Sequence, residues 1–137
     1  LTGSKVKSVC MNALGHHPEE NTDNASIFLK MENGCTGVIN YFANGSKAYS
    51  KERVEVYSQE RTLIMNNFRK TEGFGIKGFS SLKTKIDKGH KQQFQSLNQA
   101  IVTGGVPLIP FDEIINTTKA SFAAIESLKQ GAWVEVE

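Results

Sequence analysis

One loop in the sequence concentrates side chains that can bind a polar ligand. Residues 44–52 read Asn-Gly-Ser-Lys-Ala-Tyr-Ser-Lys-Glu, which places an amide, a hydroxyl, two ammonium groups, a phenol and a carboxylate between two stretches with strand patterning. Loops held by regular elements often carry binding residues, and several hydrogen-bonding groups in one place suit a polyhydroxylated ligand. A solvated connection between strands has the same composition, so the residues alone leave both interpretations open.

A glycine-rich segment matches the letters of a nucleotide-binding motif but lacks its context. Residues 73–78 read Gly-Phe-Gly-Ile-Lys-Gly, the spacing of the dinucleotide fingerprint Gly-x-Gly-x-x-Gly. That motif works between a buried parallel strand and the N-terminus of a helix, where backbone N–H groups meet the pyrophosphate. Neither neighbour is indicated here. We therefore expect a glycine-rich loop and no cofactor-binding residue in this chain.

No other grouping of reactive side chains points to catalysis or to a metal. Cys10, Cys35, His16, His17 and His90 match none of the spacings that place zinc ligands on one tetrahedron. A nucleophile elbow of the Gly-x-Ser-x-Gly type is also absent. We therefore predict no catalytic residue and no metal site within these residues.

The bulk composition is that of a soluble globular protein. At 137 residues the chain has the length of one domain, and we expect residues 1–137 to form a single domain. The net charge is +2 with basic residues spread along the chain, so we expect no nucleic-acid partner. Neither a membrane-spanning apolar stretch nor a signal peptide is indicated, and Cys10 and Cys35 suit the core of a cytoplasmic protein.

Strand patterning dominates the first two thirds of the sequence. Asn33-Gly34 predicts a tight turn between two apolar strands, because these residues accept positive φ angles. A second hairpin is expected around Gln59-Glu60, followed by a long irregular connection within residues 67–87 and one more strand near 82–86. The expected strands of the two hairpins, with the strand that precedes them, are residues 5–12, 25–31, 35–42, 52–57 and 62–65.

The pattern changes to a helical period at Lys88. One helix is expected to end at Gly104-Gly105, and a second to run from Phe111 or Asp112 to Gly131 before a short strand at 133–136. Leu1–Gly3 resemble the end of a helix, so we expect a preceding segment. The face of the second helix that we expect to be buried consists of Ile114, Ile115, Thr118, Phe122, Ile125 and Leu128.

Antiparallel strands followed by two helices predict an α+β fold. We expect an open, mostly antiparallel sheet with the two helices of the C-terminal half packed on one face. Apolar side chains occur in both registers of residues 25–42, so the other face should contact another subunit or a domain outside this chain.

Several separate motifs are distributed over nearly the whole chain. They are Asp23-Asn24-Ala25-Ser26, Gly34-x-x-Gly37-x-Ile39-x-Tyr41-Phe42-Ala43-Asn44-Gly45-Ser46-Lys47, Lys51-Glu52-Arg53-Val54-Glu55-Val56, Ile109-Pro110-Phe111, Glu126-Ser127-Leu128-x-x-Gly131 and the closing Trp-Val-Glu-Val. In this order they resemble the C-terminal domain of one family, the NAD(P)-dependent dehydrogenases of the glucose-fructose oxidoreductase, inositol dehydrogenase and MocA type (Gfo/Idh/MocA).

The resemblance implies a division of labour between two domains. Members of the family join an N-terminal Rossmann domain, which holds NAD or NADP, to a C-terminal domain with a large open sheet, and they oxidise or reduce a hydroxyl of a sugar or cyclitol. The family's Glu-Lys-Pro motif is absent from this sequence, as is the helix that carries its acid and histidine. The Rossmann domain is thus the implied partner, and the chain's role would be substrate binding and homo-oligomerisation through the open sheet face.

The same resemblance favours the ligand-binding interpretation of the loop, which borders the substrate pocket in the family. It implies that Asn44, Lys47, Tyr49 and Lys51 are donors to a sugar-like substrate. The loop is more basic than in better-known members, which suggests the hypothesis of an anionic or nucleotide-linked sugar. The alternative is a non-catalytic module that binds a protein through its open sheet face.

Overall fold

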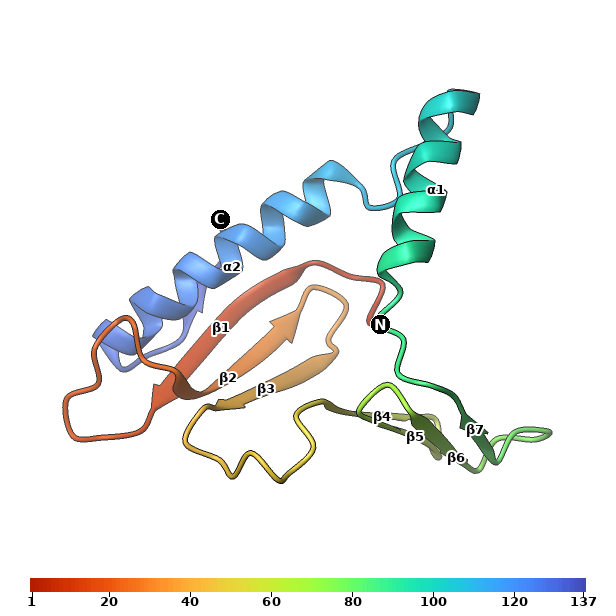
Figure 1. Ribbon diagram of the computed structural model, residues 1–137. Coiled ribbons are helices and arrows are strands. Elements are labelled where there is room, and N and C mark those ends of the chain that lie inside the picture. The colour runs from red at the N-terminus through yellow and green to blue at the C-terminus, as the bar shows by residue number, and fades with distance from the viewer. The chain divides into compact units, whose positions relative to one another are not determined.

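The computed structural model describes residues 1–137, and the backbone divides into two units (Figure 1). The first contains Leu1–Gly45 and Pro107–Glu137, and the second contains Ser46–Val106. Each unit holds one helix and one four-stranded antiparallel sheet, so the strands form two sheets where we expected one. The predicted α+β class is confirmed, whereas the assignment of the whole chain to a single domain stays a prediction.

The first unit is built on a sheet whose strands lie in the order β3-β2-β1-β8. These strands are β1 (Val6–Ala13), β2 (Asn24–Met31), β3 (Thr36–Phe42) and β8 (Val134–Glu135). The predicted hairpin between β2 and β3 is confirmed, with Gly34 at a φ of 85° in its turn. The expectation of a positive φ at Asn33 as well, as in a type I′ turn, was wrong. The sheet therefore leaves β3 as one edge and the short β8 as the other.

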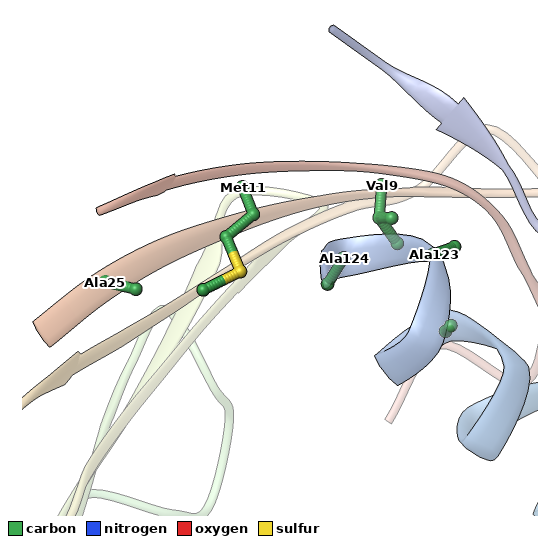
Figure 2. Close-up of a cluster of buried hydrophobic side chains, with 6 residues drawn as sticks. Val9, Met11, Ala25, Ala123 and Ala124 are labelled. Atoms are coloured by element: carbon green, nitrogen blue, oxygen red, sulfur yellow. The ribbon is translucent and has the colours of Figure 1, made fainter. Parts of the chain in front are cut away.

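Helix α2 (Phe111–Gln130) packs against β1 and β8 and closes the core of the first unit. The face that it buries carries small residues at helical spacing, which lets the helix approach the sheet closely. Val9 is fully buried there and Met11 is 8% exposed. Figure 2 shows Val9 pointing toward Ala123 and Ala124. The buried face of α2 consists of Ala120, Ala123, Ala124 and Ser127.

The prediction of which α2 face is buried was wrong for its largest side chains. Ile114, Ile115 and Phe122 are 45%, 40% and 67% exposed, while only Ile125 and Leu128 from the predicted set pack against the core. The hydrophobic pattern of a helix predicts that its bulky apolar residues are buried, but a face of alanines can pack closer to a strand. The bulky side chains thus lie outside the core of the first unit.

The second unit is a meander of four short strands in the order β4-β5-β6-β7. They are β4 (Arg53–Ser58), β5 (Arg61–Asn66), β6 (Lys70–Phe74) and β7 (Ser81–Lys83). Gln59 and Glu60 have φ angles of 49° and 61°, which confirms the expected turn of the second hairpin. β6 lies within the stretch that we expected to be irregular, because its polar sequence Lys-Thr-Glu-Gly-Phe gives no strand alternation.

The second unit contains no buried residue. Helix α1 (His90–Thr103) ends at Gly104, as expected, but none of its residues is buried and it has no extensive contact with any strand. Phe94 and Ile101 on its apolar side are 69% and 71% exposed. The expectation that both helices pack on a sheet therefore holds for α2 alone. Cys35, which we expected in the core, is exposed at the start of β3.

Candidate functional site

The predicted binding loop begins in the first unit, where its backbone is tied to β2. The N–H of Asn44 donates to Asn24 Oδ1 at 3.0 Å, and the N–H of Ala43 donates to the carbonyl of Asp23 at 3.0 Å. A turn follows, in which Gly45 N–H donates to the carbonyl of Phe42 at 3.2 Å. The side chain of Asn44 is exposed and makes no hydrogen bond, so its amide is free for a ligand.

The other three predicted ligand donors lie in the second unit. Lys47, Tyr49 and Lys51 are exposed, and none of their side chains forms a hydrogen bond or an ion pair. A local turn shapes the segment, since the N–H of Tyr49 donates to the carbonyl of Ser46 at 3.0 Å. The structure thus leaves both ammonium groups and the phenol available, on an open surface and not in a closed pocket.

The end of the loop is fixed to the second sheet through Glu52. Its carbonyl accepts the N–H of Asn67 at 2.7 Å, and its carboxylate pairs with Lys88 Nζ at 2.9 Å. The same ammonium group lies 5.6 Å from the centre of the Phe68 ring. These contacts hold Glu52, the last residue of the loop, against the turn between β5 and β6.

β4 continues from the loop with three interacting polar side chains on one face. Arg53 Nε pairs with Glu55 Oε1 at 2.6 Å, and Arg53 Nη1 donates to Asn66 Oδ1 at 3.2 Å. The hydroxyl of Tyr57 donates to Glu55 Oε2. The sequence predicted a strand at residues 52–57 but not this network, because strand patterning does not say which side chains of a neighbouring strand lie beside it.

The network shifts the pKa values of its members. The hydrogen bond from Tyr57, followed by that from Arg53, lowers the pKa of Glu55 below its ordinary value. The hydrogen bond to Glu55 raises the pKa of Tyr57 and that of Arg53, and Tyr49 makes a smaller contribution to the rise at Arg53. The carboxylate is therefore held ionised at neutral pH, while the phenol and the guanidinium keep their protons.

The strand register extends this polar face across the whole second sheet. Arg53 lies opposite Asn66, Asn66 opposite Lys70, and Lys70 opposite Lys83, so one row crosses four strands. Lys70 pairs with Glu72 at 2.6 Å, in the same arrangement as Arg53 with Glu55. The other face is apolar. Its residues include Val54, Val56, Leu63, Met65 and Leu82.

The glycine-rich segment 73–78 has structural explanations in the second unit. It runs from β6 into the turn before β7, and no helix follows it directly. A Cβ on Gly73 would lie 2.5 Å from the ring of Phe79, and a Cβ on Gly75 would lie 2.6 Å from the carbonyl oxygen of Glu60. Close packing accounts for both glycines. The backbone around them does not resemble the strand-loop-helix site that binds a dinucleotide.

The described residues contain neither a metal-binding cluster nor a membrane-spanning helix. Nowhere in residues 1–137 do three or more histidine, cysteine, aspartate or glutamate side chains gather in an arrangement that could hold a metal ion. Neither α1 nor α2 combines the length and apolar character that a bilayer span requires.

Solved structures with the same fold include a dehydrogenase in complex with NADH and an NAD-binding oxidoreductase. Levoglucosan dehydrogenase in complex with NADH and levoglucosan matches with a TM-score of 0.75 and 17% sequence identity, over 96% of this chain and 45% of its own. An NAD-binding oxidoreductase from Klebsiella pneumoniae matches with a TM-score of 0.77 and 17% identity, over 97% of this chain and 46% of its own. No protein-family model and no curated protein matches the sequence.

A third match is an oxidoreductase from Agrobacterium radiobacter in complex with NAD+, L-tartaric acid and magnesium, with a TM-score of 0.76, 17% identity, and coverage of 96% of this chain and 44% of its own. This chain has the fold of the Gfo/Idh/MocA C-terminal domain. It spans about half the length of each of these oxidoreductases. The resemblance found in the motifs is thus confirmed for the fold of the Gfo/Idh/MocA C-terminal domain.

Proposed function

We propose that this chain is the substrate-binding and oligomerisation part of an NAD(P)-dependent oxidoreductase that acts on a hydroxyl of a sugar, sugar derivative or cyclitol. One observation carries the proposal: nearly the whole chain matches about half of oxidoreductases solved with NADH or NAD+, and one of these was solved with levoglucosan. In such a reaction a hydride passes from the carbinol carbon to the nicotinamide and the hydroxyl loses its proton.

The chain's own part in this proposal is to bind and orient the substrate. Asn44, Lys47, Tyr49 and Lys51 carry donor groups without internal partners, and sugar hydroxyls, carboxylates and phosphates all accept from such donors. The hydrogen bonds from the N–H of Asn44 to Asn24 Oδ1 and from the N–H of Tyr49 to the carbonyl of Ser46 set the backbone from which these side chains extend. Substitution of the donors should therefore weaken substrate binding and leave cofactor binding unchanged.

The proposal assigns the cofactor and the catalytic acid-base groups to a Rossmann domain outside these residues. The polar loop and sheet face of the second unit offer no strand-loop-helix site for a pyrophosphate, since the glycines at 73–78 serve packing. Both cysteines are free, which fits the proposed cytoplasmic location.

Exposed apolar side chains support the proposed oligomer. β3 forms an edge of its sheet and contains no charged residue. On the sheet face opposite α2, Phe28, Val38 and Phe42 are 43%, 54% and 53% exposed. Strand edges and faces of this composition are usually covered by another chain or domain. A homo-oligomer through the open sheet face would remove this surface from water.

Calorimetric titration with NAD and NADP tests the assignment of roles. The chain of 137 residues and the intact protein that contains it are titrated side by side. Binding by the intact protein alone is the expected result, because the nucleotide site lies outside the chain in this proposal. Binding by the 137-residue chain would contradict the assignment and direct attention to the loop at 73–78.

The second candidate function is a non-catalytic module that binds a protein through its open sheet. The apolar surface of β3 favours it as directly as it favours an oligomer. The same titration separates the two candidates. An intact protein that binds neither NAD nor NADP supports the interaction module and excludes the oxidoreductase.

A further inference from the structure

The two units carry opposite net charges, which the overall value of +2 conceals. Eleven of the sixteen basic residues and five of the fourteen acidic residues lie in Ser46–Val106. The second unit therefore has a formal charge of +6, and the first unit has the remaining five basic and nine acidic residues, a charge of −4. A charge of +6 on a unit of this size creates a field that attracts anions.

Most of the positive charge in the second unit is not neutralised locally. Three ion pairs occupy Glu52, Glu55 and Glu72, which leaves only Glu60 and Asp87 among the acidic residues of the unit. Eight basic residues remain without an acidic partner. They are Lys47, Lys51, Arg61, Arg69, Lys77, Lys83, Lys85 and Lys91.

The loop and the polar sheet face carry basic residues that we call the cationic band, defined as Lys47, Lys51, Arg53, Lys70 and Lys83. Glu55 and Glu72 on the same face pair with Arg53 and Lys70, so the unneutralised charges of the band are those of Lys47, Lys51 and Lys83. Lys51 precedes Arg53 by two residues, and the register aligns Arg53, Lys70 and Lys83 across the sheet. Neighbouring strands lie about 4.8 Å apart, so the row from β4 to β7 spans about 14 Å. Two uncharged polar groups lie beside these basic residues. The hydroxyl of Tyr49 belongs to the loop, and the amide of Asn66 belongs to the row.

Protection of a sheet edge explains part of this band but not all of it. β7 is an edge strand, and lysines such as Lys83 and Lys85 discourage pairing with another chain. Lys47 and Lys51 belong to no strand, and Lys70 lies on an inner strand. A row that continues from a loop to an inner strand therefore needs a second reason.

We infer that the cationic band binds the negatively charged group of an anionic substrate, a sugar that carries phosphate or carboxylate. The inference rests on the proposed function and narrows its substrate class. Ammonium and guanidinium groups form charge-assisted hydrogen bonds with phosphate and carboxylate oxygens, while a neutral sugar gains nothing from a charge of +6. Lys47 and Lys51, which no carboxylate neutralises, make the largest contribution.

Calorimetry on the intact protein saturated with NAD tests this inference with four probes: glucose, glucuronate, glucose 1-phosphate and uridine diphosphate glucose. We expect at least one of the three anionic probes to bind about ten-fold more tightly than glucose, which corresponds to about 1.4 kcal/mol. The preference should shrink when the salt concentration rises from about 0.05 to 0.5 M, because salt screens exposed charges. Comparison of glucuronate with the two phosphate-containing probes identifies whether the band prefers carboxylate or phosphate.

Charge-removing variants locate the binding surface. The double variant K47Q/K51Q should weaken the preferred anionic probe about ten-fold more than it weakens glucose, since the anion loses two charge-assisted contacts and glucose loses only hydrogen bonds to its hydroxyls. K83Q should have a smaller effect of about three-fold, because its ammonium group is farther from the loop. Lys91→Gln on α1 and Lys119→Gln on α2 remove the same charge outside the band and should have no effect on binding. NAD affinity of every variant serves as the check on folding.

Each result is decisive for one of the two proposals. Equal binding of glucose and all anionic probes by a protein that binds NAD overturns the anionic substrate and leaves the proposed function intact. An anion preference that Lys91→Gln reduces as much as K47Q/K51Q also overturns it, because general attraction would then be the cause. Failure to bind NAD or NADP contradicts the proposed function itself.

Discussion

The two units have the same number of strands and differ in what holds them together. In the first, α2 covers β1, and side chains such as Val9 and Ser127 are fully buried. In the second, residues 46–106 contain no buried residue, and the apolar face of the sheet has no helix packed on it. Sheet hydrogen bonds alone give little stability, since burial of apolar area supplies the main favourable term. The second unit therefore depends on contacts from outside itself.

The first prediction contrasts one valine from each sheet. Val9→Ala should lower the free energy of unfolding by about 2 kcal/mol or more, because it removes two methyl groups from a filled core. Val54→Ala, where the side chain is 37% exposed, should cost less than about 1 kcal/mol. Urea denaturation followed by circular dichroism measures both. Equal losses of unfolding free energy would show that Val54 is as buried in solution as Val9 and would contradict this prediction.

The second prediction concerns the one buried hydroxyl that connects α2 to the edge of β1. Ser127 Oγ accepts the N–H of Met11 at 2.9 Å and donates to the carbonyl of Ala132 at 2.6 Å. Ser127→Ala leaves both groups without a partner and should cost about 1–3 kcal/mol. Ser121→Ala is the matched control, because that exposed hydroxyl bonds only the carbonyl of Thr118 within the helix. A cost for Ser127→Ala as small as that of the control would be contrary evidence.

The third prediction concerns Asn116, whose side chain pairs with β1 as a strand residue would. Its Oδ1 accepts the N–H of Val6 at 2.8 Å, and its Nδ2 donates to the carbonyl of Val6 at 3.0 Å. Asn116→Ala should cost about 1–2 kcal/mol, since both bonds are partly buried. Asn116→Asp keeps the acceptor but, when ionised, has no donor for the carbonyl of Val6, so its cost should be high at neutral pH and fall at a pH where the carboxyl is protonated and its O–H can donate. Hydrogen exchange at the Val6 amide should rise in Asn116→Ala and stay unchanged in the control Asn98→Ala.

The smallest expected effect is a pH dependence from an exposed ion pair. Lys5 Nζ lies 2.7 Å from Asp112 Oδ2, and the hydrogen bond from Lys5, with its charge, lowers the pKa of Asp112 below its ordinary value. A lowered folded pKa means that the stabilisation is complete above the ordinary value and disappears as the pH falls through the folded value. Thermal unfolding between pH 6 and 2 should show this loss at low salt, and Asp112→Asn should lack it. A variant that retains the full dependence would show that other carboxylates cause it.

Local sequence rules predicted most elements because those rules depend on neighbours in the chain. Asn33-Gly34 and Gln59-Glu60 set the two hairpin turns, and Gly104 and Gly131 end the two helices with left-handed φ angles of 65° and 63°. β6 was missed for the same reason, since its strand character comes from pairing with β5 and not from its own alternation. The composition of the binding loop was likewise visible in the sequence, whereas its ligand role stays a prediction.

The sequence by itself determined the α+β class, the hairpins, the ends of the helices and the presence of a donor-rich loop at residues 44–52. Only the tertiary structure decided that α2 buries its alanines and exposes Phe122, and that Arg53, Lys70 and Lys83 align in one row. The physical reason is that turns, caps and periods are set by residues a few positions apart. The choice of a helix face and the register of a strand depend on shape and pairing between segments far apart in the chain.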